Sequence, residues 1–519
     1  MQRKLLIGLA AALMLILVVS VAAYAQGTEK EYTGYQVMNL ATAPGSDAHV
    51  RIEYYKQDGT LAKTAQNVTI PPGGSANIQQ KSETDLPAGV YSAVLSSDQP
   101  IAAVVGQIES DPSTPDLIYK TPFSDYTGIS TGSTTVSLPS MEVNWFGLDS
   151  LARIQNVGDS TATISVQFKT SSLNGVAAGQ ATINPISMTI PKYAAVTLDP
   201  TQYTQQLVAT SGSFQGRFFG SAIVTSDQPL AAIANETDVT KRIKYTYNGF
   251  GDADSGAELL APGIFWQWYN TLTSLAVANP TNQTCAVTIT YTAGAGSQLI
   301  GGADGAGQTK VVNFSLAPGE SRTAYEGAAA NSDLADKFQR FGGGARISTS
   351  TAGCKLVAKV NQTQYTPNPN GSNPSGSFNA VPTATLTTKV AIPLIQADFY
   401  GYFTSLTCAN ADQVNPATVN ITYTSDATLS GVPNRSDTVT HTIPAGGTII
   451  VYEGQQNGSL ADINKSTSVW FSGGTAKFNG SAFVTSTGTA KVACVVNEVG
   501  GNVAPGDNMN SYNGVNVQP

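Results

Sequence analysis

The chain carries a short pattern of alternating apolar and polar residues that recurs four times. Each copy has three apolar positions separated by single polar residues, and the third apolar position is always aromatic. The four copies are Val50, Ile52 and Tyr54; Ile164, Val166 and Phe168; Val287, Ile289 and Tyr291; and Val419, Ile421 and Tyr423. A period of two places the apolar side chains on one face of a β-strand. The pattern therefore predicts a half-buried antiparallel strand at the same place in four repeats.

Further elements surround each alternating strand in a fixed order. A strand ending in Asn comes before it, and a proline-led turn and two more strands follow. The Asn residues are Asn39, Asn156, Asn279 and Asn410, and the proline-led turns begin at Pro71, Pro191, Pro318 and Pro444. The last two strands are joined by Ser-Asp-Gln-Pro at 97–100 and 226–229. Proline and glycine favour tight reversals, so we predict hairpin-type turns at both places.

The repeat length fits one β-sandwich plus a connector. The serines that end the penultimate strand are Ser97, Ser226, Ser350 and Ser486, spaced by 129, 124 and 136 residues. Several short strands per repeat, with little 3.6-residue periodicity, favour a two-sheet fold. We expect an all-β chain of four tandem Ig-like antiparallel β-sandwich modules, divided as signal peptide 1–25, modules at 26–122, 123–244, 245–364 and 365–503, and a tail at 504–519.

The connectors between modules also repeat. Each runs from a tyrosine through a strand with proline to aromatic residues, and the first two begin with a Tyr-x-Gly sequence, as in Tyr126-Thr127-Gly128 followed by Trp145-Phe146. Aromatic side chains bury large areas. We therefore expect structured connectors whose aromatic residues pack between neighbouring sandwiches and stiffen the chain into a semi-rigid rod.

The order of these motifs resembles tandem Ig-like β-sandwich modules of exported bacterial surface and matrix proteins. The likeness covers nearly the whole chain after residue 25 and rests on strand and turn motifs. The third copy departs from it, because Thr351-Ala352-Gly353-Cys354 stands where two other copies have Ser-Asp-Gln-Pro. The resemblance implies a place on the cell surface or in the extracellular matrix, and it transfers no catalytic residue.

The amino terminus has the layout of a secretory signal peptide. Arg3 and Lys4 precede an apolar stretch, and Ala23-Tyr24-Ala25 offers a small-x-small cleavage site. We expect cleavage after Ala25 and no membrane insertion afterwards, while a retained membrane anchor is the alternative. Loss of Arg3 and Lys4 moves the net charge from −8 to −10. An acidic chain without a basic cluster argues against nucleic-acid binding.

The four cysteines fall in pairs within repeats. Cys285 and Cys354 lie in the third repeat, Cys408 and Cys494 lie in the fourth, and no CxxC spacing is present. Exported proteins normally carry paired cysteines. We predict one intramodule disulfide in each of the last two modules.

Catalytic and metal-binding motifs are scarce. The two histidines, His49 and His441, lie in different modules, and no phosphate-binding loop, HExxH or GxSxG motif occurs. We expect neither an enzyme nor a bound cofactor. The one metal candidate is a structural calcium site at Asp252, Asp254 and Glu258, although an ordinary acidic loop is the alternative because calcium needs six to eight oxygen ligands.

Two groups of residues are candidates for binding. The first contains the connector aromatics Trp145, Trp266, Trp268, Tyr269 and Tyr400, which either pack between modules or form a platform for sugar rings. The second is the carboxyl-terminal sequence Tyr512-Asn513-Gly514, the beginning of a connector with no module after it. This tail either docks on the first module of another copy, giving head-to-tail filaments, or caps the chain.

The sequence therefore predicts a secreted, non-enzymatic structural protein of the cell surface or extracellular matrix, such as a sheath, filament or coat subunit. Its expected partners are other copies, surface proteins or glycans. The alternative is an adhesin or glycan-binding array, and an enzyme or enzyme accessory is the third reading.

Overall fold

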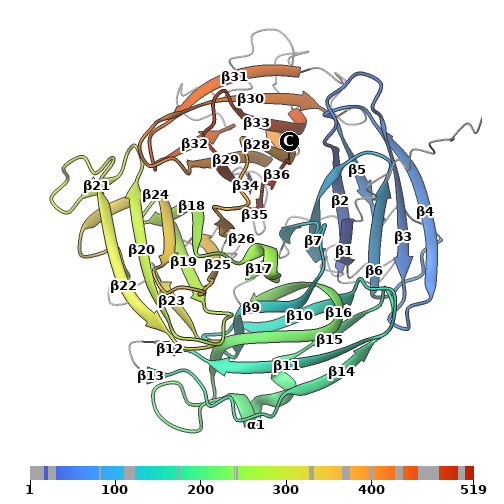
Figure 1. Cartoon of the computed structure of the whole chain (residues 1–519), viewed down its shortest axis with the longest axis horizontal. Helices are drawn as coiled ribbons and strands as arrows, with labels where there is room; N and C mark the ends of the chain where they lie inside the picture. The colour runs from blue at the N-terminus through green and yellow to red at the C-terminus, as the bar shows by residue number, and fades with distance from the viewer. Residues whose placement is uncertain are drawn as a thin grey trace, which may run out of the picture.

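The chain folds into antiparallel β-sheets. The computed structural model describes residues 17–21, 31–80, 83, 85–109, 123–173, 176–238, 240, 243–325, 332–364, 374–397, 399, 402–426, 436–453, 478–500 and 509–518. In this part the helical elements are α1 (Thr204–Leu207), η3 (Pro200–Tyr203) and η4 (Asp252–Asp254). The all-β prediction is confirmed. Figure 1 shows four units, each with an outer and an inner layer of strands, arranged in a closed ring.

The strands of the first two units are as follows. The first unit has an outer sheet of β1 (Leu17–Val21), β6 (Tyr91–Ser97), β3 (Ala48–Tyr55) and β4 (Leu61–Ile70), and an inner sheet of β5 (Ser75–Gln79), β2 (Glu31–Asn39), β7 (Ile101–Glu109) and β8 (Phe123–Thr127). The second unit has β9 (Ser133–Val143), β11 (Ala162–Thr170) and β14 (Ile186–Ile190) outside, β15 (Ala195–Leu198), β10 (Asp149–Asn156) and β17 (Ile243–Asn248) inside, and β16 (Phe218–Asp238) in both layers, with a small hairpin of β12 (Ser172–Leu173) and β13 (Val176–Ala177).

The third and fourth units repeat this plan. The third has an outer sheet of β22 (Thr309–Leu316), β20 (Cys285–Ala293), β24 (Phe338–Thr349), β18 (Glu258–Trp266) and β27 (Val381–Pro382), with β21 (Gln298–Leu299) beside β24, and an inner sheet of β23 (Ser321–Tyr325), β19 (Thr271–Ala278), β25 (Val357–Gln364) and β26 (Ser375–Asn379). The fourth has an outer sheet of β31 (Ser436–Ile443), β30 (Ala417–Ser425), β33 (Phe478–Ser486), β28 (Lys389–Ala397) and β36 (Val515–Asn516), and an inner sheet of β32 (Thr448–Tyr452), β29 (Tyr402–Asn410), β34 (Val492–Gly500) and β35 (Met509–Asn513).

Each unit has its own hydrophobic core, and the alternating strands supply its centre. The three apolar residues of β3, β11, β20 and β30 are at most 1% exposed in every copy. They belong to four separate core clusters, one per unit. The period of two therefore predicted correctly which side chains face inward.

The Asn that ends the second strand of each repeat ties two turns together. In the third unit, Asn279 Nδ2 donates to the carbonyl oxygens of Gln283 at 2.7 Å and Leu316 at 3.0 Å, while its Oδ1 accepts from Thr281 N at 2.9 Å. Two other copies make the same set of bonds, and the fourth differs only in that its amide donates to Pro444 O, one residue later in the turn. These involve Asn39, Asn156 and Asn410. A buried amide that satisfies three backbone groups explains why the same residue stands at this place in each repeat.

The turns predicted as hairpins instead carry the chain from one sheet to the other. Strand β6 lies in the outer sheet and β7 in the inner sheet, so the Ser-Asp-Gln-Pro sequence at 97–100 is a corner between layers. The proline-led turn at Pro71 likewise joins β4 of the outer sheet to β5 of the inner sheet. The hairpin prediction is wrong because turn chemistry fixes a reversal but not the sheet that receives the next strand.

Each unit also ends later than the sequence predicted. Strands β8, β17 and β35, which run into the Tyr-x-Gly sequences, and their counterpart β26 pair with the last strand of the preceding repeat rather than opening the next one. The units therefore run over 31–127, 133–248, 258–382 and 389–516, with β1 added to the first.

Both predicted disulfides are present. Cys285–Cys354 joins β20 of the outer sheet to the segment just before β25 of the inner sheet. Cys408–Cys494 joins the neighbouring strands β29 and β34 of one inner sheet. The described part of the chain holds no free cysteine.

The ring is closed at its outer layer by equivalent contacts between units. A serine of one penultimate strand donates to the proline-led turn of the next unit: Ser92 to the Tyr193 oxygen and Ser221 to the Gly319 oxygen at 2.5 Å. The same contact joins the fourth unit to the first, since Ser481 Oγ donates to the Gly73 oxygen at 3.0 Å. Units one and four are therefore neighbours.

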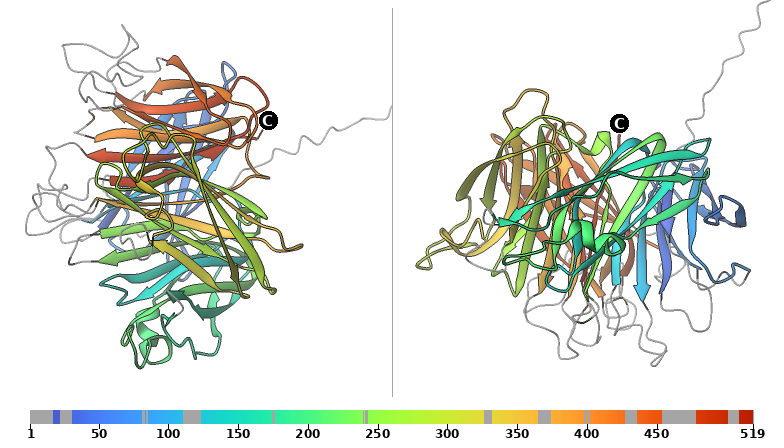
Figure 2. Two further views of the ribbon diagram at one scale, coloured as in Figure 1. Left: turned by 90° about the vertical axis from the view of Figure 1, so that its left-hand side faces the viewer. Right: turned by 90° about the horizontal axis from the view of Figure 1, so that it is seen from below.

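A cycle of four hydrogen bonds closes the centre of the ring. Asn248 Nδ2 donates to Thr127 O at 2.7 Å and Asn379 Nδ2 donates to Asn248 O at 2.9 Å. Asn513 Nδ2 then donates to Asn379 O at 2.6 Å, and Thr127 Oγ1 completes the cycle by donating to Asn513 O at 3.0 Å. These residues end β8, β17, β26 and β35, which lie against one another at the axis (Figures 1 and 2). The expected rod is therefore wrong: the units form a ring.

Candidate functional site

Three corner loops between the outer and the inner layer carry the connector aromatics, and they are built alike; each is closed by one antiparallel backbone bridge, and we refer to these loops as hairpins. They join β9 to β10, β18 to β19 and β28 to β29, with backbone bridges Trp145–Leu148, Trp268–Thr271 and Phe399–Tyr402. A hydroxyl at the start of the second strand accepts a backbone N–H from the first strand in each case. Trp145, Trp268 and Phe399 are therefore equivalent positions.

The first two of these hairpins hold non-glycine residues in the left-handed region. In the first, φ is +49° at Asn144 and +53° at Phe146. In the second, φ is +51° at Gln267, +47° at Tyr269 and +67° at Asn270. A bulky aromatic residue rarely adopts positive φ, and such a conformation costs about 1–3 kcal/mol. Two units therefore hold the same strain at the same place.

The strained aromatic residues project into solvent and lie beside arginines. Phe146 is 53% exposed with the Arg217 guanidinium 4.2 Å from its ring centre. Tyr269 is 72% exposed, and the Arg340 guanidinium lies 5.5 Å from the rings of both Tyr269 and Trp268. Each of these two hairpins thus presents a flat apolar face next to a cation.

The tryptophans pack within their own units. Trp145 contacts Phe146, Phe214 and Phe219, all of the second unit. Trp268 contacts Phe265 and Tyr269 of the third unit.

Trp266 is only 8% exposed and belongs to the core of the third unit, where its Nε1 donates to Phe338 O at 3.0 Å. The predicted packing of these aromatics between neighbouring units is therefore wrong. Tyr400 lies outside the described residues.

All three hairpins lie at the same end of the ring. In the inner sheets, Asp149 pairs with Thr237, Thr271 with Gln364 and Tyr402 with Gly500, so each hairpin adjoins the end of its unit's last long strand. The carboxyl-terminal residue of β35, Asn513, lies at the other end. We call the surface that carries the hairpins the hairpin face.

The calcium candidate does not form a site. Asp254 Oδ2 accepts from Gly251 N at 2.9 Å, Asp252 faces Ser133 Oγ at 3.3 Å, and Glu258 is paired with Arg346. Across the described ranges, no three His, Cys, Asp or Glu side chains gather as metal ligands would. The three carboxylates follow one another in sequence but point to different partners.

The carboxyl-terminal tail belongs to its own chain. Tyr512 is 1% exposed in the core of the fourth unit, and its strand β35 pairs with β34. Asn513 takes part in the central cycle, and Gly514 N donates to Cys494 O at 2.9 Å. The prediction of a tail available to another copy is therefore wrong, because the strand completes the last inner sheet.

A buried ion pair at the second junction was not predicted from the sequence. Lys359 Nζ pairs with Glu236, and the two side chains are 1% and 0% exposed. Asn361 Nδ2 donates to the second oxygen of Glu236 at 2.8 Å, and Lys359 lies 4.8 Å from the Tyr247 ring centre. Burial raises the pKa of the nearby Glu142 well above its ordinary value; the charge of Glu236 raises it further, and that of Lys359 opposes the rise.

At the junction that closes the ring, two acids are buried, and neither forms an ion pair with another described residue. Asp125 is 2% exposed, and burial raises the pKa of its carboxyl to about 8. Burial also raises the pKa of Glu498 well above its ordinary value, with the charge of Asp125 adding to the rise. Thr404 Oγ1 donates to both oxygens of Glu498 at 2.8 and 3.1 Å, whereas Asp125 Oδ2 has no hydrogen-bond partner among the described residues.

The sequence contains a signal for these junction residues. Near the end of the last long strand of each repeat, the same position carries Gln or Glu: Gln107, Glu236, Gln362 and Glu498. In three repeats an Asn precedes it. A polar residue at one fixed position after four largely apolar runs indicates a shared buried environment, which the apolar run of a single strand does not reveal.

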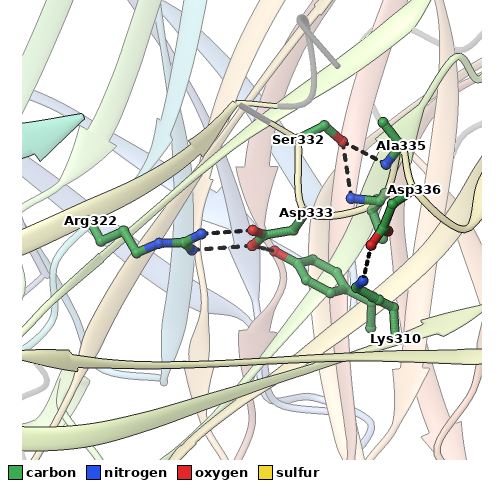
Figure 3. Close-up of polar contacts among 8 residues, drawn as sticks. Lys310, Arg322, Ser332, Asp333, Ala335 and Asp336 are labelled. Carbon is green, nitrogen blue, oxygen red and sulfur yellow. Dashed lines mark hydrogen bonds and ion pairs between the residues drawn. The ribbon is translucent and has the colours of Figure 1, made fainter. Parts of the chain in front are cut away.

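A third polar cluster fixes a loop of the third unit (Figure 3). Arg322 forms a two-pronged ion pair with Asp333, at 2.7 Å for the closest atoms, and Tyr291 Oη donates to the same carboxylate at 2.8 Å. Ser332 Oγ accepts from Leu334 N and Ala335 N at 3.0 Å. The cluster ties the loop before β24 to the aromatic residue of β20, so its role is structural.

Comparison with known proteins gives no family. No protein-family model matches the chain, and no curated protein matches it. Within the described residues, no helix combines the length and the apolar character needed to cross a membrane.

Proposed function

We propose that the chain is an exported, non-enzymatic protein of the cell surface or extracellular matrix, and that it binds glycans through the hairpin face. On this proposal the four units are copies of one Ig-like module, and the ring is a rigid support for the hairpins. Head-to-tail filament formation through the tail lacks support, since Tyr512 is buried and Asn513 is hydrogen-bonded within its own chain. A glycan-binding role therefore fits the geometry better than a filament subunit.

The two strained hairpins carry this proposal. Exposed aromatic side chains with positive φ gain little from packing, so folding stability does not explain why two units hold them. Flat aromatic faces stack on the apolar faces of sugar rings, and the arginine beside each can donate to hydroxyl or carboxylate oxygens of a sugar. Tyr269 with Arg340 and Phe146 with Arg217 are the two expected contact points.

Glycan binding by hairpin variants tests the proposal. We expect Tyr269→Ala to weaken binding at least about tenfold on a glycan array or in calorimetry, because central aromatic contacts dominate recognition. The double variant, in which Phe146→Ala is added to Tyr269→Ala, should bind more weakly still. Tyr325→Ala is the matched control, since Tyr325 is also exposed, at 44%, but lies on β23. Unchanged binding in the double variant, with an unaltered melting temperature, contradicts this role.

A further inference from the structure

The first strand of each unit has a defined place between two units. Strands β9, β18 and β28 pair with the penultimate strand of their own unit. They also lie against the inner strands of the following unit: β9 against β19 and β25, β18 against β29 and β34, and β28 against β2 and β7. The first strand therefore completes an outer sheet and fills a junction of the ring.

In the first unit this place is filled by a segment of the predicted signal peptide. Strand β1 pairs with β6 over five residues, from Leu17 opposite Leu95 to Val21 opposite Tyr91. It also contacts β10 and β16 of the second unit, as its counterparts contact theirs. The chain from 31 onward begins directly with β2 of the inner sheet.

The register of β1 matches that of the other first strands. Leu17 and Val19 stand opposite Leu95 and Ala93. The residues at these two positions in the other units are Val136 and Leu138, Leu259 and Ala261, and Val390 and Ile392. All six are at most 1% exposed. The sequence of β1 is thus the sequence that the first-strand position requires: apolar residues at alternate positions and no charge.

Removal of this strand would leave a slot of the same shape. The edge of β6 would lose its hydrogen-bonding partner over Tyr91–Leu95, and the core-facing residues Ala93 and Leu95 would lose their neighbours in the sheet. An unpaired edge beside an apolar core binds an extended peptide by strand addition. Within the described chain from 31 onward the other strands are already paired in sheets, so none is free to take the place.

We propose that Leu17–Val21 is the first strand of the first unit, and that after cleavage at Ala25 the slot binds an uncharged, apolar extended segment donated by another polypeptide. This inference rests on the export in the proposed function and on the cleavage after Ala25 that the sequence predicts, and it is independent of glycan binding. The donated segment has the chemistry of Leu17–Val21: apolar at alternate positions, β-branched and without charge.

Peptide binding to the processed chain tests the slot. The probe is a synthetic peptide of residues 14–24 with two lysines added at its carboxyl end for solubility, and the control peptide carries Leu17→Asp and Val19→Asp. We expect the chain that begins at Gln26 to bind the probe at least about tenfold more tightly than the control, since two buried charges oppose strand addition. The full chain, whose slot is occupied, should bind neither.

Amide hydrogen exchange gives a second readout that does not depend on the peptide's solubility. In the chain beginning at Gln26, those amides of Tyr91–Leu95 that face the β1 side of β6 should exchange at least about tenfold faster than in the full chain and slow down when the probe is added. Strand β24, which keeps its first-strand partner β18, is the internal reference for correct folding. Slow exchange of these amides without any peptide, together with no probe binding, overturns the slot.

The intact mass of the protein isolated from an exporting host separates the two parts of the inference. A mass that begins at Gln26 supports processing. A mass that retains residues 1–25 overturns the processing step, while the peptide experiment still decides whether the first unit has an acceptor slot.

Discussion

Two junctions of the ring bury acidic side chains almost completely but differ in how the charge of these side chains is neutralised. Between the second and third units, Lys359 is paired with Glu236. Between the fourth and first units, Asp125 and Glu498 are buried together, and the described residues give them no ion-pair partner. One junction thus holds a charged pair and the other holds acids whose raised pKa favours the neutral form.

The equivalent residue at the other junctions shows what is common to all four. Lys359 occupies the position of Val104, Ile233 and Val495 in the last long strands of the other units. Each of these three apolar residues packs into the core of the preceding unit around the ring. Apolar packing at this position is therefore shared by three junctions and replaced by Lys359 at the fourth, whereas the central cycle of hydrogen bonds links all four units.

The largest expected effect is a dependence of stability on pH at the closing junction. The pKa of Asp125 is about 8 in the folded chain and about 4 in an unfolded one. Between these values the folded chain holds a proton that the unfolded chain releases, so the free energy of unfolding falls as pH rises. At about 1.4 kcal/mol per unit, the loss is on the order of 5 kcal/mol.

Replacement of the acid separates this effect from the rest of the protein. Asp125→Ser places at this position the hydroxyl that Ser377 and Ser511 supply in the third and fourth units. Urea unfolding at about pH 4, 6 and 8 should show a much flatter pH dependence for Asp125→Ser than for the natural chain. Equal slopes for the two proteins would show that Asp125 does not titrate inside the junction.

Loss of Lys359 at the junction between the second and third units should lower the free energy of unfolding by slightly less. Lys359→Met leaves Glu236 buried without its partner, which destabilises a protein by about 3–5 kcal/mol. The double variant Lys359→Met with Glu236→Gln removes both charges and should recover most of this loss. Denaturant unfolding compares the two, and a double variant as unstable as the single one would contradict the ion-pair account.

The smallest expected effect concerns the central hydrogen bonds. Asn513 makes two bonds with the backbone of Asn379, at 2.6 and 2.8 Å, whereas Asn248 makes one with Thr127. At about 1 kcal/mol per bond, Asn513→Ala should destabilise the protein by about 2 kcal/mol and Asn248→Ala by about 1 kcal/mol. Thermal unfolding of the two variants measures the difference, and the reverse order would place the weaker side of the cycle between the third and fourth units.

Local chemistry made the strands, the buried residues and both disulfides predictable. The alternation at Val287, Ile289 and Tyr291 reflects the pleat of a single strand, and each cysteine pair lies within one repeat. The closed ring was not predictable from the same patterns. Its contacts, such as Ser481 to Gly73, join residues about as far apart as the chain allows, and no local pattern reports such a pairing.

The sequence was misleading about which unit certain strands belong to. Tyr512-Asn513-Gly514 looks like an unfinished connector only if such sequences open a unit, but they close one, as β8 does on β7. The sequence identified Trp268 and Tyr269 of the candidate site as connector aromatics. It did not predict the positive φ of Tyr269 or the neighbouring Arg340, because both depend on tertiary packing.

Small-angle X-ray scattering of the purified chain tests the closed ring most directly. A compact chain of this length has a radius of gyration of about 24 Å, so the ring should give a value close to that. Four sandwiches in a row, each about 35 Å long, would instead give a value near 40 Å. A value close to the first supports closure of the fourth unit on the first, and a value close to the second contradicts it.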